Sequence, residues 1–196
     1  MTSFWTGKRI RLRGIEPDDW TAFMRFAEEE AGTGNLPCPP RSAEHHRARV
    51  KEQAAALSDG DCFQLAIEAL ETGKIVGSVG SFHADPRSGW FEYGVVIDAG
   101  HRRSGYAAEA VRLLLRHMFE ERRFHKCQAR ILAYNTASLA LHQRLGFVEE
   151  GRLREHVYVS GRHQDLVVMG ILAEEFARAH PSDGFADGTA PARADT

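Results

Sequence analysis

Cysteines are few in this sequence, and their spacing indicates neither a disulfide framework nor a zinc site. Cys38, Cys62 and Cys127 are odd in number, lie far apart and form no C-x-x-C pair. Disulfide-rich secreted domains and structural zinc sites depend on paired or closely spaced cysteines. No H-E-x-x-H or comparable frame organises the ten histidines either. We therefore expect reduced thiols, a cytoplasmic location and no bound metal.

Long apolar runs and an excess of one charge are also absent. No stretch approaches ~18 uninterrupted apolar residues, and residues 1–14 lack the apolar segment of a signal peptide. The formal net charge is only −2, so the chain has no global basic field. These absences argue against a membrane protein, an exported protein and a nucleic-acid-binding protein.

The composition and the hydrophobic periodicity indicate an α+β protein. The 196 residues are 43% hydrophobic, which is enough for one globular domain over residues 1–179. Residues 180–196 are rich in Gly, Pro, Ala and Asp, and we expect a disordered tail there. The periodicity predicts strands at 9–14, 62–69, 75–82, 90–97, 126–134, 147–159 and 164–172, and helices at 17–30, 42–57, 107–124 and 135–145.

The stretch GHRRSGYAAEA, residues 100–110, places a basic turn between an expected strand and an expected helix. The first N–H groups of a helix have no intrahelical partner and lie at the positive end of its dipole, so they form an anion site. Gly105 brings no Cβ near a ligand, Ala107 adds little bulk, and Arg102 and Arg103 supply positive charge. The pattern predicts a phosphate or pyrophosphate ligand; the alternative is an ordinary turn with solvated arginines. A P-loop is excluded because the G-x-x-x-x-G-K-[ST] frame is absent.

This turn and the residues around it resemble a known family. Arg102-x-x-Gly105-x-Ala107, after a strand that carries Glu92, resembles the acyl-CoA pyrophosphate loop of the GNAT N-acetyltransferase superfamily, Q/R-x-x-G-x-G/A. Downstream, Asn135-x-x-Ser138 and the sequence LGF at 145–147 resemble the ribosomal-protein and spermidine acetyltransferase branch. The resemblance covers residues 7–176. It implies the GNAT fold, a mixed and mostly antiparallel sheet of about seven strands flanked by helices.

The resemblance implies acetyl-CoA as cosubstrate, held where the sheet splays between the strand of Glu92 and the strand of Ile131. The main chain of the first of these strands is expected beside the acetyl carbonyl, and the turn around the pyrophosphate. Asn135 is expected to contact the cofactor through its side-chain amide, and its alternative role is a helix cap. The cofactor residues implied in this way are Val95, Val96, Ile97, Arg102, Arg103, Ser104, Gly105, Tyr106, Ala107 and Asn135.

Three residues are candidates for the catalytic groups. An amine must lose a proton before it attacks a thioester, and the resemblance assigns Glu92 as the base. Glu92 is alternatively a cation-binding group or an ordinary strand glutamate paired with an arginine. The departing thiolate needs a proton, and Ser138 and His142 compete to supply it. His142 stands where many family members have a tyrosine, and its alternative role is packing.

The remaining hypotheses differ in the amine that accepts the acetyl group. The resemblance places a protein N-terminal α-amine first, with a polyamine or an aminoglycoside-like amine as the alternative, and a non-catalytic acyl-CoA-binding module as a different class. The loop at residues 33–41 lies where the family builds its acceptor site. The acidic run Glu28 to Glu30 either attracts a polyamine or is a solvated helix end. Homodimerisation is a further expectation from the family.

Overall fold

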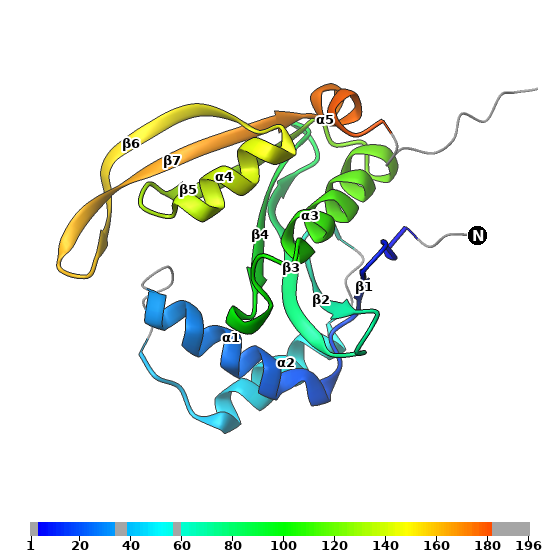
Figure 1. Cartoon of the computed structure of the whole chain (residues 1–196), viewed down its shortest axis with the longest axis vertical. Helices are drawn as coiled ribbons and strands as arrows, with labels where there is room; N and C mark the ends of the chain where they lie inside the picture. The colour runs from blue at the N-terminus through cyan, green and yellow to red at the C-terminus, as the bar shows by residue number, and fades with distance from the viewer. Residues whose placement is uncertain (1–3, 34–38, 57–59, 182–196) are drawn as a thin grey trace, which may run out of the picture.

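The computed structural model describes residues 4–33, 39–56 and 60–181 of the chain (Figure 1). Its main elements, in chain order, are β1 (Ile10–Arg13), α1 (Trp20–Thr33), α2 (Ala43–Ala55), β2 (Phe63–Ala69), β3 (Ile75–Asp85), β4 (Trp90–Ile97), α3 (Tyr106–Arg116), β5 (Lys126–Leu132), α4 (Thr136–Leu145), β6 (Val148–Val159), β7 (Arg162–Leu172) and α5 (Ala173–Ala179). Short 3₁₀ helices lie at Pro17–Asp19 and Ala99–His101, and a π-helical turn, His117–Glu121, follows α3. The expected tail falls outside the described residues from residue 182 onward.

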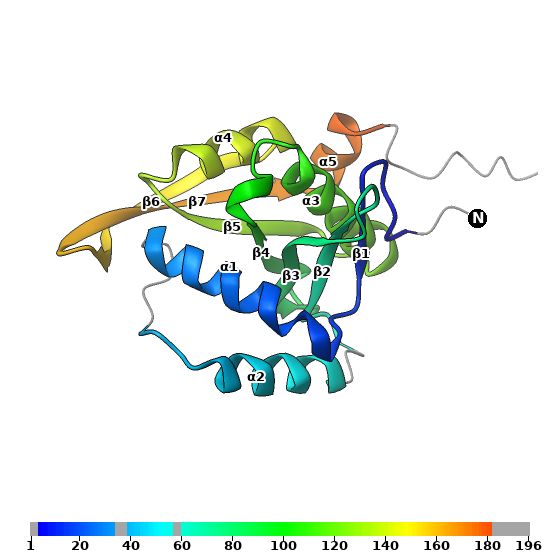
Figure 2. The same cartoon turned by 60° about the horizontal axis from the view of Figure 1, so that its bottom comes forward.

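The strands form one seven-stranded sheet in the order β1-β2-β3-β4-β5-β7-β6. Every neighbouring pair is antiparallel except β4 and β5, which are parallel. The helices α1 and α2 cover one face of the sheet, and α3, α4 and α5 cover the other (Figures 1 and 2). The mixed, mostly antiparallel sheet of seven strands flanked by helices is therefore confirmed.

The larger part of the core lies between the sheet and α3. This helix buries Ala110, Val111 and Leu114, whose spacing of three and four residues gives it one apolar face. The opposing strand β4 contributes Phe91, which is fully buried. Each such large apolar side chain contributes about 1.5–3 kcal/mol on burial. The α3 face of the sheet is thus the rigid support on which the turn before α3 rests.

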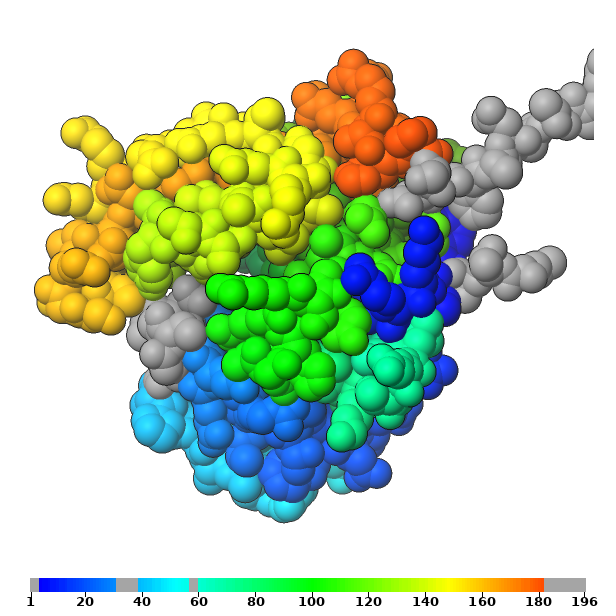
Figure 3. All heavy atoms as spheres, in the orientation of Figure 1, coloured from blue at the N-terminus to red at the C-terminus, as the bar shows by residue number. Residues whose placement is uncertain are grey.

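The sheet opens between β4 and β5. Their register is Trp90↔Lys126, Phe91↔Cys127 and Glu92↔Gln128. Beyond Glu92, β4 follows β3 as far as Ile97, whereas β5 follows β7, so these two described strands part from each other. Figure 3 shows the surface hollowed between α3 and α4, above this region. The opening therefore lies between the strand of Glu92 and the strand of Ile131, as the family resemblance implies.

Three local features differ from the expected pattern. The helix after the turn is expected to reach residue 124, but α3 ends at Arg116 and the π-helical turn that follows it ends at Glu121, before Arg123, whose φ of 60° lies outside the helical region. Strand β7 begins two positions before the expected residue 164, directly after a hairpin turn in which Ser160 and Gly161 both have positive φ. The short helix α5 was not expected; it buries Phe176.

No helix among the described residues is long and apolar enough to cross a membrane.

Candidate active site

The turn before α3 has the backbone geometry of an anion site. Arg103 and Gly105 have φ values of 65° and 79°, and Gly105 is the N-cap of α3. The first backbone bond of the helix runs from Glu109 N–H to Gly105 C=O, 3.2 Å. The N–H groups of residues 106–108 therefore precede the helical ladder, at the positive end of its dipole. The exposed side chains of Arg103 and Ser104 flank this end.

Arg9, which directly precedes β1, stabilises the turn through hydrogen bonds. Its guanidinium donates to Glu109 Oε2 at 3.1 Å and to the Ser104 carbonyl at 2.8 Å, and its backbone N–H donates to Glu109 Oε1 at 2.9 Å. Glu109 is buried, with 5% of its surface exposed. A Cβ at Gly105 would lie 2.6 Å from Arg9 Nη2, so the end of the Arg9 side chain would have to shift, and the positive φ itself favours glycine. Sequence analysis missed Arg9 and Glu109, because no local pattern links residues so far apart in the chain.

The side chain of Arg102 faces α1. Its Nε donates to the Ile97 carbonyl at 3.2 Å, and Nη2 lies 3.7 Å from Glu30 and 4.0 Å from Glu29. Glu29 also accepts a hydrogen bond from the backbone N–H of Ala99 at 2.8 Å. Two members of the acidic run thus hold the turn. In this geometry the Arg102 guanidinium contacts α1, and its expected role at the pyrophosphate stays a prediction.

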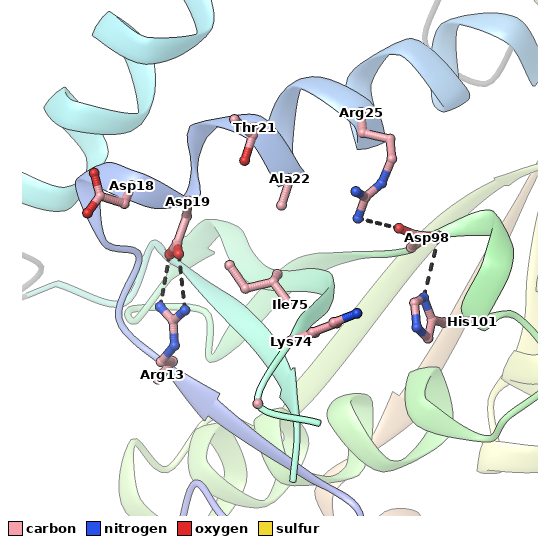
Figure 4. A pocket seen from close by; sticks show the side chains of 11 residues that line it. Arg13, Asp18, Asp19, Thr21, Ala22, Arg25, Lys74, Ile75, Asp98 and His101 are labelled. Atoms are coloured by element: carbon pink, nitrogen blue, oxygen red, sulfur yellow. Dashed lines mark hydrogen bonds and ion pairs between the residues drawn. The ribbon is translucent and has the colours of Figure 1, made fainter. Parts of the chain in front are cut away.

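A second connection between α1 and the turn passes through Asp98 (Figure 4). Arg25 forms an ion pair with Asp98, and His101 Nδ1 lies 3.5 Å from Asp98 Oδ1. Although burial opposes ionisation, the Gly100 N–H and the Arg25 guanidinium lower the pKa of Asp98 below its usual value. A cavity of about 590 Å³ borders this cluster, and its lining includes Lys74 but none of the site residues expected from the sequence.

The main chain of β4 presents alternate residues to the opening. Asp98 N–H donates to Val76 C=O at 2.9 Å and therefore points toward β3. Because main-chain groups alternate along a strand, those of Val96 also point toward β3, whereas those of Val95 and Ile97 point toward the opening. The Ile97 carbonyl already accepts from the Arg102 side chain. Val95 is thus the residue whose N–H suits a developing oxyanion.

Glu92 lies where β4 and β5 part. It is the last residue of β4 paired with β5, and 8% of its surface is exposed. Its Oε2 lies 3.3 Å from Nδ1 of His83, whose side chain is 68% exposed. The ring of Phe82 lies over Gly94, the next residue on the same face of the strand, where an added Cβ would come within 3.1 Å of Phe82 Cε1. The expected base is therefore buried, next to the opening, and in contact with an exposed histidine.

A pocket of about 160 Å³ lies on the Glu92 face, between α1, α2 and the sheet. Val96 is on its floor, about 13 Å along the strand from Glu92 at ~3.3 Å per residue. Glu30, His46 and Ser78 are among its polar lining residues. Burial, followed by the nearby His45, lowers the pKa of His46, so this imidazole is neutral at neutral pH. Most of the loop expected to set acceptor specificity, residues 34–38 with Cys38, lies outside the described residues.

Two of the expected site residues lie at the start of α4. Asn135 is the N-cap, and its Oδ1 accepts from the Ser138 N–H at 3.1 Å. The side-chain NH₂ of Asn135 is the group left for a cofactor contact. Ser138 is half-buried in the first turn, and its Oγ lies 3.4 Å from His142 Nδ1. The structure thus brings Asn135, Ser138 and His142 together on α4.

His142 is buried against β4, with 4% of its surface exposed. Its Nδ1 lies 2.7 Å from the Ser138 carbonyl oxygen, and its Nε2 lies 2.7 Å from the Tyr93 hydroxyl. Burial lowers the pKa of His142 more than the hydrogen bond to Ser138 raises it. A buried, neutral imidazole with a partner at each nitrogen does not present a proton to the opening. Sequence analysis did not identify this partnership of His142 with Tyr93.

The comparisons with known proteins agree on one family. The family model for an acetyltransferase (GNAT) domain matches residues 9–148. A prophage-derived uncharacterized N-acetyltransferase of Bacillus subtilis, YokL, is 32% identical over 91% of this chain and 98% of its own length. The putative ribosomal N-acetyltransferase YdaF of B. subtilis is 30% identical over 70% of this chain and 74% of its own length.

The solved structures agree in fold. The spermidine N-acetyltransferase of Vibrio cholerae, crystallised with CoA and spermine, superposes with a TM-score of 0.74 at 21% identity, covering 85% of this chain and 97% of that one. The N-terminus of α3 and the opening beside β4 suit the pyrophosphate and the thioester of acetyl-CoA. Among the described residues, no group of three or more His, Cys, Asp or Glu side chains is arranged to hold a metal ion. The chain belongs to the GNAT family and is an acetyl-CoA-dependent N-acetyltransferase.

Proposed function

We propose that the acceptor is a protein N-terminal α-amine. The observation that carries this proposal is the state of the acidic run on α1. Glu29 and Glu30 are engaged by Arg102 and the Ala99 N–H, and the pocket between α1 and α2 is lined by Arg49 and a neutral His46 as well as by Glu30. A polyamine carries several positive charges and needs several available carboxylates. A single amine at the end of a peptide needs only one, and Glu92 provides it.

The coverage of the relatives supports the same choice. The chain covers 74% of the putative ribosomal N-acetyltransferase YdaF. It covers 49% of a spermidine N(1)-acetyltransferase of Vibrio cholerae, at 31% identity. The sequence similarity to the ribosomal-type relative therefore extends over a larger share of that protein, although the fold is shared with the spermidine enzyme over 97% of its chain.

Each site residue has one role in the proposed reaction. The N–H groups of residues 106–108 bind the pyrophosphate, with Arg103 and Ser104 as flanking contacts and the Asn135 amide as a further one. Glu92 takes a proton from the α-amine, whose pKa near ~8 leaves much of it charged at neutral pH. The amine nitrogen then bonds to the acetyl carbon while the Val95 N–H stabilises the negative charge on the carbonyl oxygen. The carbon–sulfur bond breaks, the Ser138 hydroxyl supplies a hydrogen bond or proton to the thiolate, and the second proton, which the nitrogen loses as the amide forms, leaves the thiol and the serine both protonated.

The proposal also includes a cytoplasmic location and a homodimer. Both come from the sequence and from the family resemblance rather than from any contact described above. The homodimer is tested by size-exclusion chromatography with light scattering, in which a mass near twice 21.9 kDa supports it and a monomer mass contradicts it.

The acceptor is tested by product analysis. Purified protein with acetyl-CoA is offered N-terminal peptides, the same peptides blocked at the α-amine, spermidine and an aminoglycoside, and mass spectrometry locates each acetyl group. The proposal predicts acetylation of the free α-amine and none of the blocked peptide. Acetylation of spermidine or the aminoglycoside alone would contradict the assigned acceptor. Binding of acetyl-CoA with no product from any acceptor would instead favour a non-catalytic module.

A further inference from the structure

A buried pair of side chains joins β4 to α4 at the point where the sheet opens. Tyr93 follows Glu92, the last residue of β4 that pairs with β5. Its hydroxyl lies 2.7 Å from Nε2 of His142 on α4. Tyr93 and His142 are 6% and 4% exposed, so water does not compete for this bond. Where the backbone pairing between the two halves of the sheet stops, this hydrogen bond therefore ties α4 to β4.

The chemistry of the partners fixes the direction of both hydrogen bonds. The Ser138 carbonyl oxygen can only accept, so His142 Nδ1, 2.7 Å away, carries the proton. Burial keeps His142 neutral by lowering its pKa, so Nε2 carries a lone pair. Burial, followed by Cys127, raises the pKa of Tyr93 well above its usual value, so its hydroxyl stays protonated and donates to Nε2.

This arrangement cannot pass a proton to the departing thiolate. Loss of the Nδ1 proton of His142 would require Nε2 to gain one from Tyr93, which would leave a buried tyrosinate. The Tyr93 pKa lies well above 10, whereas an ordinary thiol titrates near ~8.5, so the thiolate is too weak a base to drive this transfer. The pair therefore acts through geometry rather than through proton donation.

The hydrogen-bonded pair of Tyr93 and His142 fixes the position of the first turn of α4. His142 Nδ1 donates to the Ser138 carbonyl and lies 3.4 Å from the Ser138 hydroxyl. The ring of Phe147 packs against both partners, with centroids 5.1 Å from His142 and 5.9 Å from Tyr93. We propose that Tyr93 and His142 are positioning residues that hold Ser138 at the opening of the sheet. The role of Ser138 toward the thiolate rests on the proposed function.

Three single variants, one double variant and one control variant test this inference. Tyr93→Phe and His142→Leu remove the connection, and we expect kcat to fall about tenfold or more because Ser138 is misplaced, while KM for acetyl-CoA stays within about twofold. Their combination should be no slower than either alone, because both remove the same contact. His142→Gln keeps one donor and one acceptor without a titratable ring, so it should retain kcat within about threefold of wild type. Tyr158→Phe, a 63% exposed tyrosine on β6, is the matched control.

Specific results overturn the inference. If His142→Gln is as slow as His142→Leu, the imidazole itself is needed and His142 is a proton donor. If the double variant loses the product of the single losses, Tyr93 and His142 act independently. Thermal unfolding and acetyl-CoA calorimetry on every variant separate these results from misfolding.

The pair can also be examined without turnover. Long-range ¹H–¹⁵N spectra of the wild-type protein at pH 7 should show His142 neutral, with the proton on Nδ1. A proton on Nε2, or an imidazolium, contradicts the inference. If no acceptor is acetylated, the proposed function fails while this spectrum still tests the pair.

Discussion

The replacement Gly105→Ala tests the turn before α3 most sharply. Gly105 has a φ of 79°, and an added Cβ would lie 2.6 and 2.9 Å from the two terminal nitrogens of Arg9. Such contacts are too short to persist, so the Arg9 guanidinium must move. Arg9 then loses its side-chain hydrogen bond to Glu109 and its bond to the Ser104 carbonyl.

The expected loss in the free energy of unfolding is about 3 kcal/mol. The left-handed conformation costs an alanine about 1–2 kcal/mol. A hydrogen bond to a charged group contributes about 1.5–3 kcal/mol, and the lower end applies because half of the Arg9 side chain, 53%, is exposed. The backbone N–H of Arg9 still donates to the buried Glu109, which limits the penalty on that carboxylate.

Urea denaturation measures the stability loss, and calorimetry measures the affinity for acetyl-CoA. Because the first N–H groups of α3 move with the turn, we expect the affinity to fall at least about tenfold. Gly14→Ala is the matched control, because nothing lies within 4 Å of its added Cβ and its φ is not positive. It should leave stability unchanged or raise it by up to ~1 kcal/mol. If the two variants behave alike, the reasoning about Arg9 and the turn is wrong.

Three further predictions concern stability and reactivity. Asn135→Ala removes the cap of α4 and should cost about 1 kcal/mol in urea denaturation, whereas Asn135→Asp should keep most of it. Burial opposes ionisation of Glu68, yet hydrogen bonds from two arginines of β1 lower its pKa. The stability that ionised Glu68 contributes is therefore complete above its unfolded pKa of 4.5 and is lost as the pH falls below that value. Glu68→Gln should flatten the pH dependence of the free energy of unfolding in this acidic range. Burial, followed by Glu92, raises the pKa of Cys127, so mass spectrometry should find exposed Cys62 alkylated in the native protein and Cys127 alkylated only after unfolding.

Much of the fold follows from local sequence patterns. Strand β4 spans the residues expected from WFEYGVVI, Ser42 caps α2, and Asn135 and Gly146 bound α4. Each of these features depends on neighbouring residues, such as a capping side chain, a glycine with positive φ or an apolar run. The short α5 gives a weaker signal: Glu175 caps its start by accepting from the Leu172 N–H, but among its seven residues only Phe176 is buried, so its periodicity is too weak to detect.

The site could be predicted only in part, because its contacts join distant residues. The turn at 102–107 was identified from its motif, but the Arg9–Glu109 contact joins residues separated by 100 positions. The partnership of His142 with Tyr93 spans 49 positions and depends on how α4 packs on β4. In the sequence His142 is only a titratable residue at a position where many family members have a tyrosine. Its positioning role is indicated only by the buried partners that the structure places at its two ring nitrogens. The roles of the cofactor and catalytic residues stay predictions.

The most direct test of the account is the catalytic role of Glu92. Thiol release is measured with saturating acetyl-CoA and the preferred acceptor, for the wild-type protein and for Glu92→Gln, with Glu71→Gln in the exposed β2–β3 turn as the control. A general base contributes about 10²–10⁴-fold, so the account predicts at least a 100-fold lower kcat for Glu92→Gln, with unchanged affinity for acetyl-CoA and an unaffected control. Turnover by Glu92→Gln equal to that of the wild type would contradict it.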